Sequence, residues 1–160
     1  MERGARYQVM AIIVKSPDEI AAMRRAGSVV ASILKTLSKE IKDGVTTRHL
    51  DDIAVSELVR YGAVSSFKGY MGFSATLCVS INEEIVHGIP GERKIHEGDI
   101  VSLDFGAIVD GFHGDAAVTV GVGNISHQAQ KLLETTRGSL EAGIKAVRNG
   151  AHLGDISAAI

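Results

Sequence analysis

The feature that most constrains the fold of this sequence is a pair of apolar runs on either side of Asp110-Gly111. An Asp-Gly pair in this setting is the strongest short-range indication of a β-hairpin with a two-residue loop. Such a loop places Asp104 opposite Ala117, and Asp115 opposite Gly106. Because side chains alternate along a strand, both carboxylates then lie on one face of the hairpin, diagonally apart by about 7–8 Å. A loop shifted by one residue would place them directly opposite, and a three-residue loop would put them on different faces.

Two like charges on an apolar hairpin are unfavourable unless a raised pKa, a basic partner or a cation offsets them. No Arg or Lys occurs between residues 99 and 121, so neither strand supplies a basic partner. Carboxylate oxygens suit divalent metals, and one aspartate can bridge two ions about 3.5–4 Å apart. The spacing alone also fits an ordinary pair of exposed strand carboxylates, and further motifs must decide between the two interpretations.

Composition favours one globular domain in a reducing compartment. The 160 residues are 45% hydrophobic, which is enough for one sizeable core. The net charge is −2 and no basic run occurs, so neither nucleic acid nor an anionic membrane is indicated as a partner. A single cysteine, Cys78, excludes an internal disulfide. No apolar stretch has the length of a membrane span or the pattern of a secretory signal, so we expect a cytoplasmic protein.

The periodicity predicts an α/β (α+β) chain, with a loose leader at 1–11 and a single domain over 12–160. Helices are expected from Ser16-Pro17 to about residue 40, from Thr46 or Thr47 to Gly62, and from Ser126 to 149–150. Strands are expected at 75–82, 99–107 and 112–121. Residues 153–160 begin another helical pattern that stops without a cap, so the chain is expected to be incomplete at its C-terminus.

The first helix carries a stripe at alternating spacings of three and four residues, which predicts its inward face. The stripe comprises Ile20, Met23, Gly27, Val30, Leu34 and Leu37. A helix-interior glycine costs up to about 1 kcal/mol relative to alanine, so Gly27 is interpreted as a point of close packing.

One histidine and a group of apolar residues are candidates for chemistry. His87 lies at a strand end just before a Gly-x-Pro turn, where loops often display reactive side chains, although the pattern by itself favours a structural or surface role. Apolar and sulfur-bearing side chains concentrate upstream, including Tyr70, Phe73 and Cys78. These residues fit either core packing or a pocket for an apolar, polarisable side chain.

Four segments together resemble type I methionine aminopeptidase in order and spacing. They are Ser16-Pro-Asp-Glu-Ile-Ala-Ala-Met-Arg24, Ser80-Ile-Asn-Glu-Glu-Ile-Val-His-Gly-Ile-Pro90, Gly98-Asp-Ile-Val-Ser-Leu-Asp104 and Gly111-Phe-His-Gly-Asp115. The resemblance extends over residues 12–160. It implies a pseudo-symmetric "pita-bread" fold, with a curved antiparallel sheet and helices on its outer face, of which this chain holds the N-terminal half and the first helices of the second half.

The resemblance also implies site roles. Asp104 would bind one divalent metal ion and Asp115 would bridge two, which could be Co, Mn, Fe or Zn. His87 would be catalytic and substrate-binding, near the scissile amide nitrogen. Tyr70, Phe73 and Cys78 would line the methionine pocket. His113 and His152 would lie outside the metal site.

The implied activity is removal of the initiator methionine from nascent polypeptides or peptide N-termini, close to the ribosome, by metal-activated water. The family's remaining histidine and two glutamate ligands lie in a C-terminal part absent here, so we expect this 160-residue form to be inactive alone. A full-length member is expected to be monomeric, whereas uncovered apolar area favours self-association of this form.

Two alternatives remain open. One is a non-catalytic pita-bread binding module. The other is a prolidase-like or proline aminopeptidase enzyme, although members of that group usually have Thr-Arg where this chain has Ala116-Ala117.

Overall fold

The computed structural model describes residues 12–160, so the expected leader at 1–11 lies outside the described residues. In chain order the elements are α1 (Pro17–Glu40), α2 (Thr47–Tyr61), β1 (Val64–Ser65), η1 (Tyr70–Gly72), β2 (Leu77–Ile81), β3 (Ile100–Val109), β4 (Phe112–Gly121), α3 (His127–Ala146) and α4 (Leu153–Ala159). The expected helices and strands are therefore present, with β2 shorter than predicted and α3 ending before Val147, whose backbone is extended.

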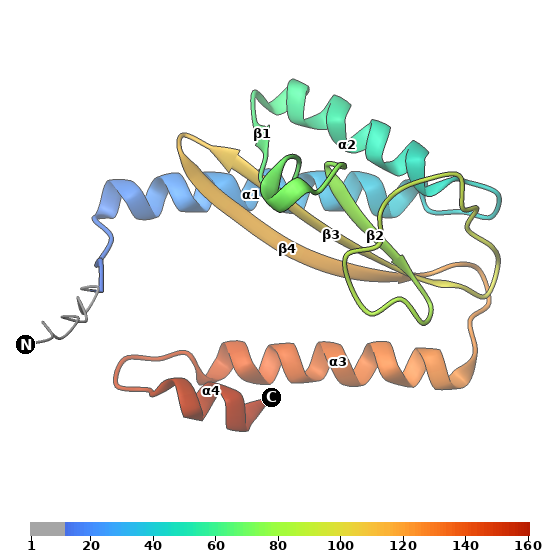
Figure 1. The fold of residues 1–160 in the computed structure, drawn as a ribbon. Coiled ribbons are helices and arrows are strands. Elements are labelled where there is room, and N and C mark those ends of the chain that lie inside the picture. Colours follow the sequence, from blue (N-terminus) through green and yellow to red (C-terminus); the bar gives the residue numbers. More distant parts are fainter. Residues whose placement is uncertain (1–11) are drawn as a thin grey trace, which may run out of the picture.

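The sheet is built around β3 and is antiparallel throughout. β4 pairs with one edge of β3, while β1 and β2 share the other edge at successive positions. Helices α1 and α2 cover one face of this sheet, and the α3–α4 hairpin lies beyond the opposite face (Figure 1). The described helices include none that is long and apolar enough to cross a membrane.

Local signals fix the ends of the first two helices. Ser16 Oγ accepts a hydrogen bond from Glu19 N, and the Glu19 carboxylate accepts one from Ser16 N, which forms the capping box at the start of α1. Thr46 rather than Thr47 caps α2, and its hydroxyl accepts from His49 N. Gly62 ends α2 with a left-handed backbone at φ 62°.

The core lies between the helical layer and the inner face of the sheet. Its fully buried large side chains are Val30, Ile33, Leu37, Leu50, Leu77, Ile81, Ile95, Val101, Leu103 and Phe105. They come from α1, α2, strands β2 and β3 and one loop position, so this part of the chain has a continuous core that holds the sheet rigid beneath its other face.

The predicted stripe on α1 is wrong over its first turns. Ile20 and Met23 are 47% and 41% exposed, whereas Ala22 and Ala26 are buried. The reason is a close approach of α1 to β4, where a Cβ on Gly114 would lie 2.7 Å from the carbonyl carbon and oxygen of Ala26. Small side chains therefore face the sheet at this point, and the larger ones turn outward.

The interpretation of Gly27 as the point of close packing is also wrong. Gly27 is exposed, and a Cβ added there would meet nothing within 4 Å. The residue that must lack a side chain is the strand glycine on the other side of the contact, Gly114.

Candidate functional site

The hairpin has the predicted register. Asp110 and Gly111 form the two-residue loop with φ of 50° and 78°, as a type I′ turn requires. Asp104 pairs with Ala117, and Asp115 pairs with Gly106. The two aspartates therefore lie on one face of the sheet, on neighbouring strands.

This face differs sharply in character from the core face. Leu103 and Phe105, which flank Asp104 on β3, are fully buried beneath the helices. The intervening positions carry polar or small side chains, namely Cys78 and Ser80 on β2, Ser102 and Asp104 on β3, and Asp115, Ala117 and Thr119 on β4. The period-two alternation thus gives one sheet an apolar face for stability and a polar face for chemistry.

The electrostatics of this face reflect two unneutralised carboxylates. Burial raises the pKa of Asp104, the nearby carboxylate of Asp115 raises it further, and His87 lowers it. Burial likewise raises the pKa of Cys78 to about 11, with added contributions from Asp104 and Asp115. Of the ion pairs among residues 12–160, none involves either aspartate.

His87 is presented by a loop that packs tightly against β2. Gly88 N donates to Ser80 Oγ at 3.1 Å, and Gly88 O accepts from Val79 N at 2.9 Å. These bonds hold the loop against the strand, and His87 itself adopts a left-handed backbone at φ 61°. A non-glycine residue in this region is uncommon and stores strain, so the surrounding contacts determine its position.

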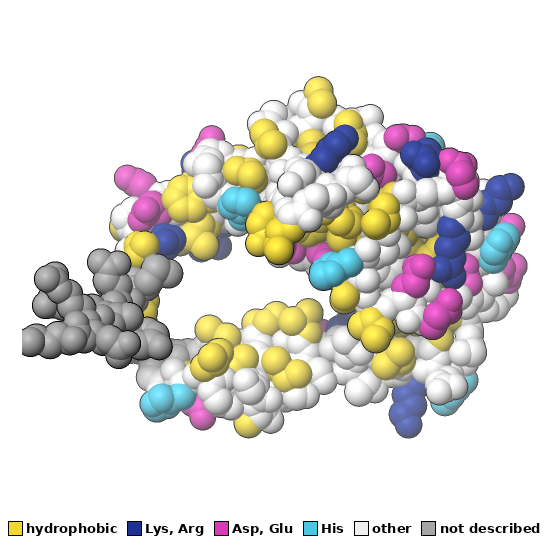
Figure 2. All heavy atoms as spheres, in the orientation of Figure 1, with side chains coloured by type: hydrophobic (Ala, Val, Ile, Leu, Met, Phe, Trp, Pro, Cys, Tyr) yellow, Lys and Arg dark blue, Asp and Glu magenta, His cyan; other side chains and the backbone are white. Residues whose placement is uncertain are grey.

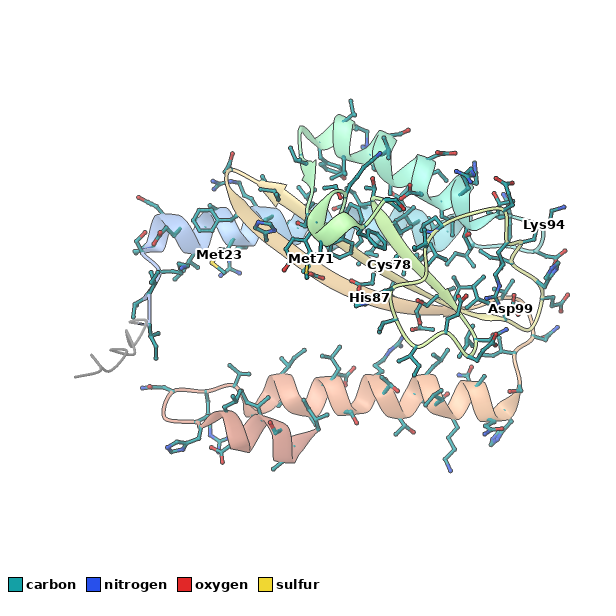
Figure 3. The ribbon with its side chains drawn as sticks, in the orientation of Figure 1. Met23, Met71, Cys78, His87, Lys94 and Asp99 are labelled. Carbon is teal, nitrogen blue, oxygen red and sulfur yellow. The ribbon has the colours of Figure 1, made fainter. Side chains whose placement is uncertain are left out.

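His87 and Asp104 line the same cleft, between the polar face of the sheet and α3. Its volume is about 710 Å³, and Ser80, Ser102 and Thr119 also line it. Figure 3 shows His87 and Cys78 on adjacent parts of this region, from the loop and from β2 respectively. Three segments distant in sequence therefore converge on one concave surface.

The three residues proposed to form the pocket lie farther apart than His87 and Asp104 do. Cys78 is 4% exposed and lies opposite Asp104 on β2. Phe73 is half-buried and packs edge-on against Phe67, with ring centroids 6.4 Å apart. Tyr70 is exposed at the start of η1, and neither it nor Phe73 is among the residues that line the cleft.

His113 and His152 each lie near a polar partner outside the cleft. His113 Nδ1 lies 3.0 Å from Ser66 Oγ, and His152 Nδ1 lies 3.8 Å from Asp155 Oδ2 on α4. Neither lines the cleft.

A row of hydroxyls that was not predicted from the sequence crosses the polar face. Ser80 pairs in register with Ser102, which pairs with Thr119, and the last two side-chain oxygens are 2.8 Å apart. The available signal was their spacing, because Ser102 lies two residues before Asp104 and Ser80 two residues after Cys78. Period-two counting from the candidate residues would have placed them on the same face.

The donor set of the polar face fits a divalent metal. Two carboxylates on one face with no basic partner need a compensating positive charge, and hard oxygen ligands suit Mn, Fe, Co, Zn or similar ions. Two side chains make only a partial ligand set, and residues 12–160 contain no group of three or more His, Cys, Asp and Glu side chains able to hold an ion. The two carboxylates alone could therefore supply only part of the ligands that such an ion needs.

Neutralising one aspartate should stabilise the metal-free protein. Because the folded-state pKa of Asp104 is raised, its contribution to stability is present below the unfolded-state pKa and is lost as the pH rises through the folded-state value. At pH 7 the charged pair therefore destabilises the fold, and Asp104→Asn should raise Tm by about 1–3 °C, equivalent to roughly 0.2–1 kcal/mol for a cross-strand pair.

The measurement is thermal unfolding followed by circular dichroism in EDTA. Asp52→Asn serves as the control because it removes the same charge from an exposed position on α2. The gain from Asp104→Asn should disappear in acid, where both aspartates are protonated. An Asp104→Asn protein that melts below wild type at pH 7 would contradict this account of the pair.

Comparison with known proteins places this geometry in a family. Residues 21–160 match metallopeptidase family M24. Methionine aminopeptidase 1 of Bacillus subtilis is 50% identical over 149 residues, which cover 93% of this chain and 60% of that protein. The crystal structure of methionine aminopeptidase from Thermotoga maritima has a TM-score of 0.90 and 41% identity, and the match covers 94% of this chain and 61% of that one.

A more distant relative, aminopeptidase P of Escherichia coli, matches with a TM-score of 0.78 and 26% identity over 89% of this chain and 32% of its own. The chain spans about 60% of the length of the methionine aminopeptidases that it matches. The α/β fold with its antiparallel sheet is the one found in those structures. On the match over residues 21–160, the chain belongs to metallopeptidase family M24.

Proposed function

We propose that this chain contributes the aspartate side of the active site of a methionine aminopeptidase, which removes the initiator methionine from peptides and nascent proteins. The observation that carries the proposal is that Asp104 and Asp115 lie on one polar sheet face and that His87 lines the same cleft as Asp104, in a chain 50% identical over 149 residues to a methionine aminopeptidase. Residues 12–160 are proposed to belong to a single catalytic domain whose remaining metal ligands this chain does not contain, acting in the cytoplasm close to the ribosome.

In this proposal the two carboxylates hold the metal. Asp104 and Asp115 would hold divalent ions there, with Co, Mn, Fe and Zn as the candidates. When bound, such ions supply Lewis acidity that favours ionisation of water near neutral pH and polarises a carbonyl oxygen. The pairing of β3 with β4 fixes the two carboxylates relative to each other, so their geometry depends on a rigid sheet rather than on a loop.

The remaining roles are proposed from the resemblance to methionine aminopeptidases. His87, on the wall of the same cleft as Asp104, donates a hydrogen bond to the substrate near the amide nitrogen of the bond to be cleaved. Cys78, Phe73 and Tyr70 contact the methionine side chain. An apolar pocket separates side chains that differ by one methylene by only about 1–3 kcal/mol, so selectivity for methionine should be good but not absolute.

Metal binding tests the proposal directly. Wild-type protein titrated with Mn²⁺ and followed by electron paramagnetic resonance should show weak uptake, and Asp115→Asn should abolish it because only one carboxylate remains. Asp52→Asn should bind like wild type. Uptake that survives in Asp115→Asn would place the metal elsewhere and refute the assignment.

Peptide cleavage provides the second measurement. Two carboxylates cannot fix two ions, so the 160-residue chain with added Co²⁺ or Mn²⁺ should show no measurable turnover of Met-Ala peptides. Ordinary turnover would contradict the expectation that ligands are missing. Cleavage of x-Pro peptides instead would favour an aminopeptidase P-like enzyme, an alternative supported by the similarity to that protein.

A further inference from the structure

The loop that carries His87 has two limbs that are held to the rest of the molecule in different ways. The limb that follows the histidine, residues 91–95, is here called the far limb, and it is bonded to the start of α2. Thr47 N donates to Arg93 O at 3.0 Å, and Thr47 Oγ1 accepts from Gly91 N at 2.8 Å. Because Thr47 is buried, these bonds fix the far limb to the folded body of the protein.

The limb that precedes the histidine, residues 82–86, is here called the near limb, and it has few anchors of this kind. Ile85 and Val86 are exposed, so apolar packing contributes little to its position. Asn82 and His87, at its two ends, have left-handed backbones with φ of 55° and 61°. Residues other than glycine adopt this conformation only when their surroundings impose it. The position of His87 therefore depends on the contacts that fix the near limb.

The side chain of Glu84 ties the near limb to two other parts of the structure. Its Oε2 accepts a hydrogen bond from Ile81 N at 2.8 Å, at the buried end of β2. Its Oε1 accepts one from Arg93 Nη1 on the far limb at 2.7 Å. Arg93 Nη2 also lies 3.8 Å from Glu83 Oε1. Since both oxygens of the Glu84 carboxylate are used in charge-assisted bonds, this side chain is more restricted than one with a single partner.

This ion pair differs from an ordinary surface pair. Figure 2 shows acidic and basic side chains gathered at the end of the molecule where the loop lies in Figure 1, and exposed pairs usually contribute little to stability. Arg48 and Glu92 form such a pair at 2.6 Å, with side chains 59% and 79% exposed. Arg93 and Glu84 are less exposed, at 43% and 38%, and Glu84 is also bonded to strand backbone. The expected effect of the second pair is therefore on geometry more than on stability.

We propose that Glu84 and Arg93 are positioning residues, which fix His87 in the cleft by fastening the near limb to the far limb. Their ion pair closes a short ring of chain that contains His87. The inference rests on the proposed function, because the position of His87 matters to the reaction only if this histidine contacts the substrate. A displacement of about 1 Å at a catalytic group can cost on the order of 100-fold in rate, so such an ion pair would be functionally important even where its contribution to stability is small.

The test is nuclear magnetic resonance of the full 160-residue chain with labelled histidine, in EDTA. Arg93→Met removes the guanidinium group but keeps an apolar stem. The imidazole signals of His87 should shift, and exchange of the Gly88 amide should quicken about two- to fivefold, the range expected when a partly exposed ion pair is lost. Glu84→Gln should shift the same signals in the same direction. Arg93→Met should have less effect in the Glu84→Gln background, because the two residues act through one contact.

Two further variants separate positioning from a general effect of charge. Arg48→Met is the matched control, because it breaks the other arginine–glutamate pair of this loop and should leave the His87 signals in place. Arg93→Lys keeps a positive charge that can pair with Glu84, so it should return the His87 signals most of the way to their wild-type positions. In all variants the amides of β3 should remain protected from exchange.

The inference would be overturned if the His87 signals were unchanged in both Arg93→Met and Glu84→Gln, or if Arg48→Met shifted them equally. Loss of protection throughout β3 would also overturn it, because the pair would then be a general stability contact. These measurements contain neither metal nor peptide, so they are independent of the Mn²⁺ titration and the peptide assay. Failure of those two experiments would refute the proposed function without changing what fixes His87.

Discussion

Replacing Gly114 with alanine should destabilise the protein by about 1–3 kcal/mol, the range for overpacking a close-packed contact. The added Cβ would lie 2.7 Å from backbone atoms of Ala26 and 2.8 Å from Gly27 N. Backbone atoms cannot rotate away as a side chain can, so α1 or β4 must move. Both are held, because α1 contributes Val30 and Leu37 to the core and β4 is tied to β3 along the hairpin.

Urea unfolding in EDTA measures this effect, and Gly27→Ala provides a control from the same contact. A methyl group at Gly27 meets nothing within 4 Å, and alanine is the better helix former, so this variant should be more stable by about 0.5–1 kcal/mol. If Gly114→Ala lowers the free energy of unfolding and Gly27→Ala raises it, space is lacking on the β4 side of the contact. An unchanged urea midpoint for Gly114→Ala would show that α1 shifts freely and would remove the contact as an explanation for the orientation of α1.

The hairpin could be predicted from sequence because its determinants are local. Asp110-Gly111 selects the turn, the turn fixes the register, and the register fixes which face carries Asp104 and Asp115. The capping box at Ser16 and the glycine stop at Gly62 are local in the same sense. Where a few consecutive residues determine the geometry, the prediction is confirmed.

The orientation of α1 could not be predicted in this way. Apolar size favoured Ile20 and Met23 as inward residues, but the distance between α1 and β4 is set by Gly114, which lies about ninety positions along the chain. Periodicity gives the angular width of a helix face and contains no information about how closely the partner element approaches. Similarly, Leu132 and Leu140 of α3 are apolar but 56% and 60% exposed, because the described residues do not cover them.

The candidate site also has one part that local residues determine and another that depends on contacts between distant segments. Sequence placed the two aspartates together through the hairpin, whereas their proximity to His87 depends on β2 pairing with the far edge of β3 and on the loop returning against β2. That pairing joins Cys78 to Asp104 across a loop that no local motif specifies. The position of His87 before a Gly-x-Pro turn made it a candidate, but only the resemblance to methionine aminopeptidases gave it a catalytic role. The hydroxyl row at Ser80, Ser102 and Thr119 became evident only once the register of all three strands was known.

Gly88→Ala should displace His87 while leaving the sheet intact. A Cβ at Gly88 would lie 2.0 Å from the carbonyl oxygen of Val79, which is an impossible contact with strand backbone. The loop is largely exposed, so it can move away from β2 and lose its two hydrogen bonds, to Val79 N and Ser80 Oγ, instead of unfolding the core. The free energy of unfolding should fall by only about 1–2 kcal/mol, consistent with two lost hydrogen bonds.

Nuclear magnetic resonance resolves this local effect. In Gly88→Ala the imidazole signals of His87 should shift and the amide of residue 88 should lose its protection from exchange, while the amides of β3 remain protected. Gly91→Ala is the matched control in the same loop, because its Cβ meets nothing within 4 Å and its φ is not positive. If the His87 signals stayed in place in Gly88→Ala, packing of the loop on Val79 could not be what positions His87 beside Asp104, and the histidine would be held by the other contacts of its loop.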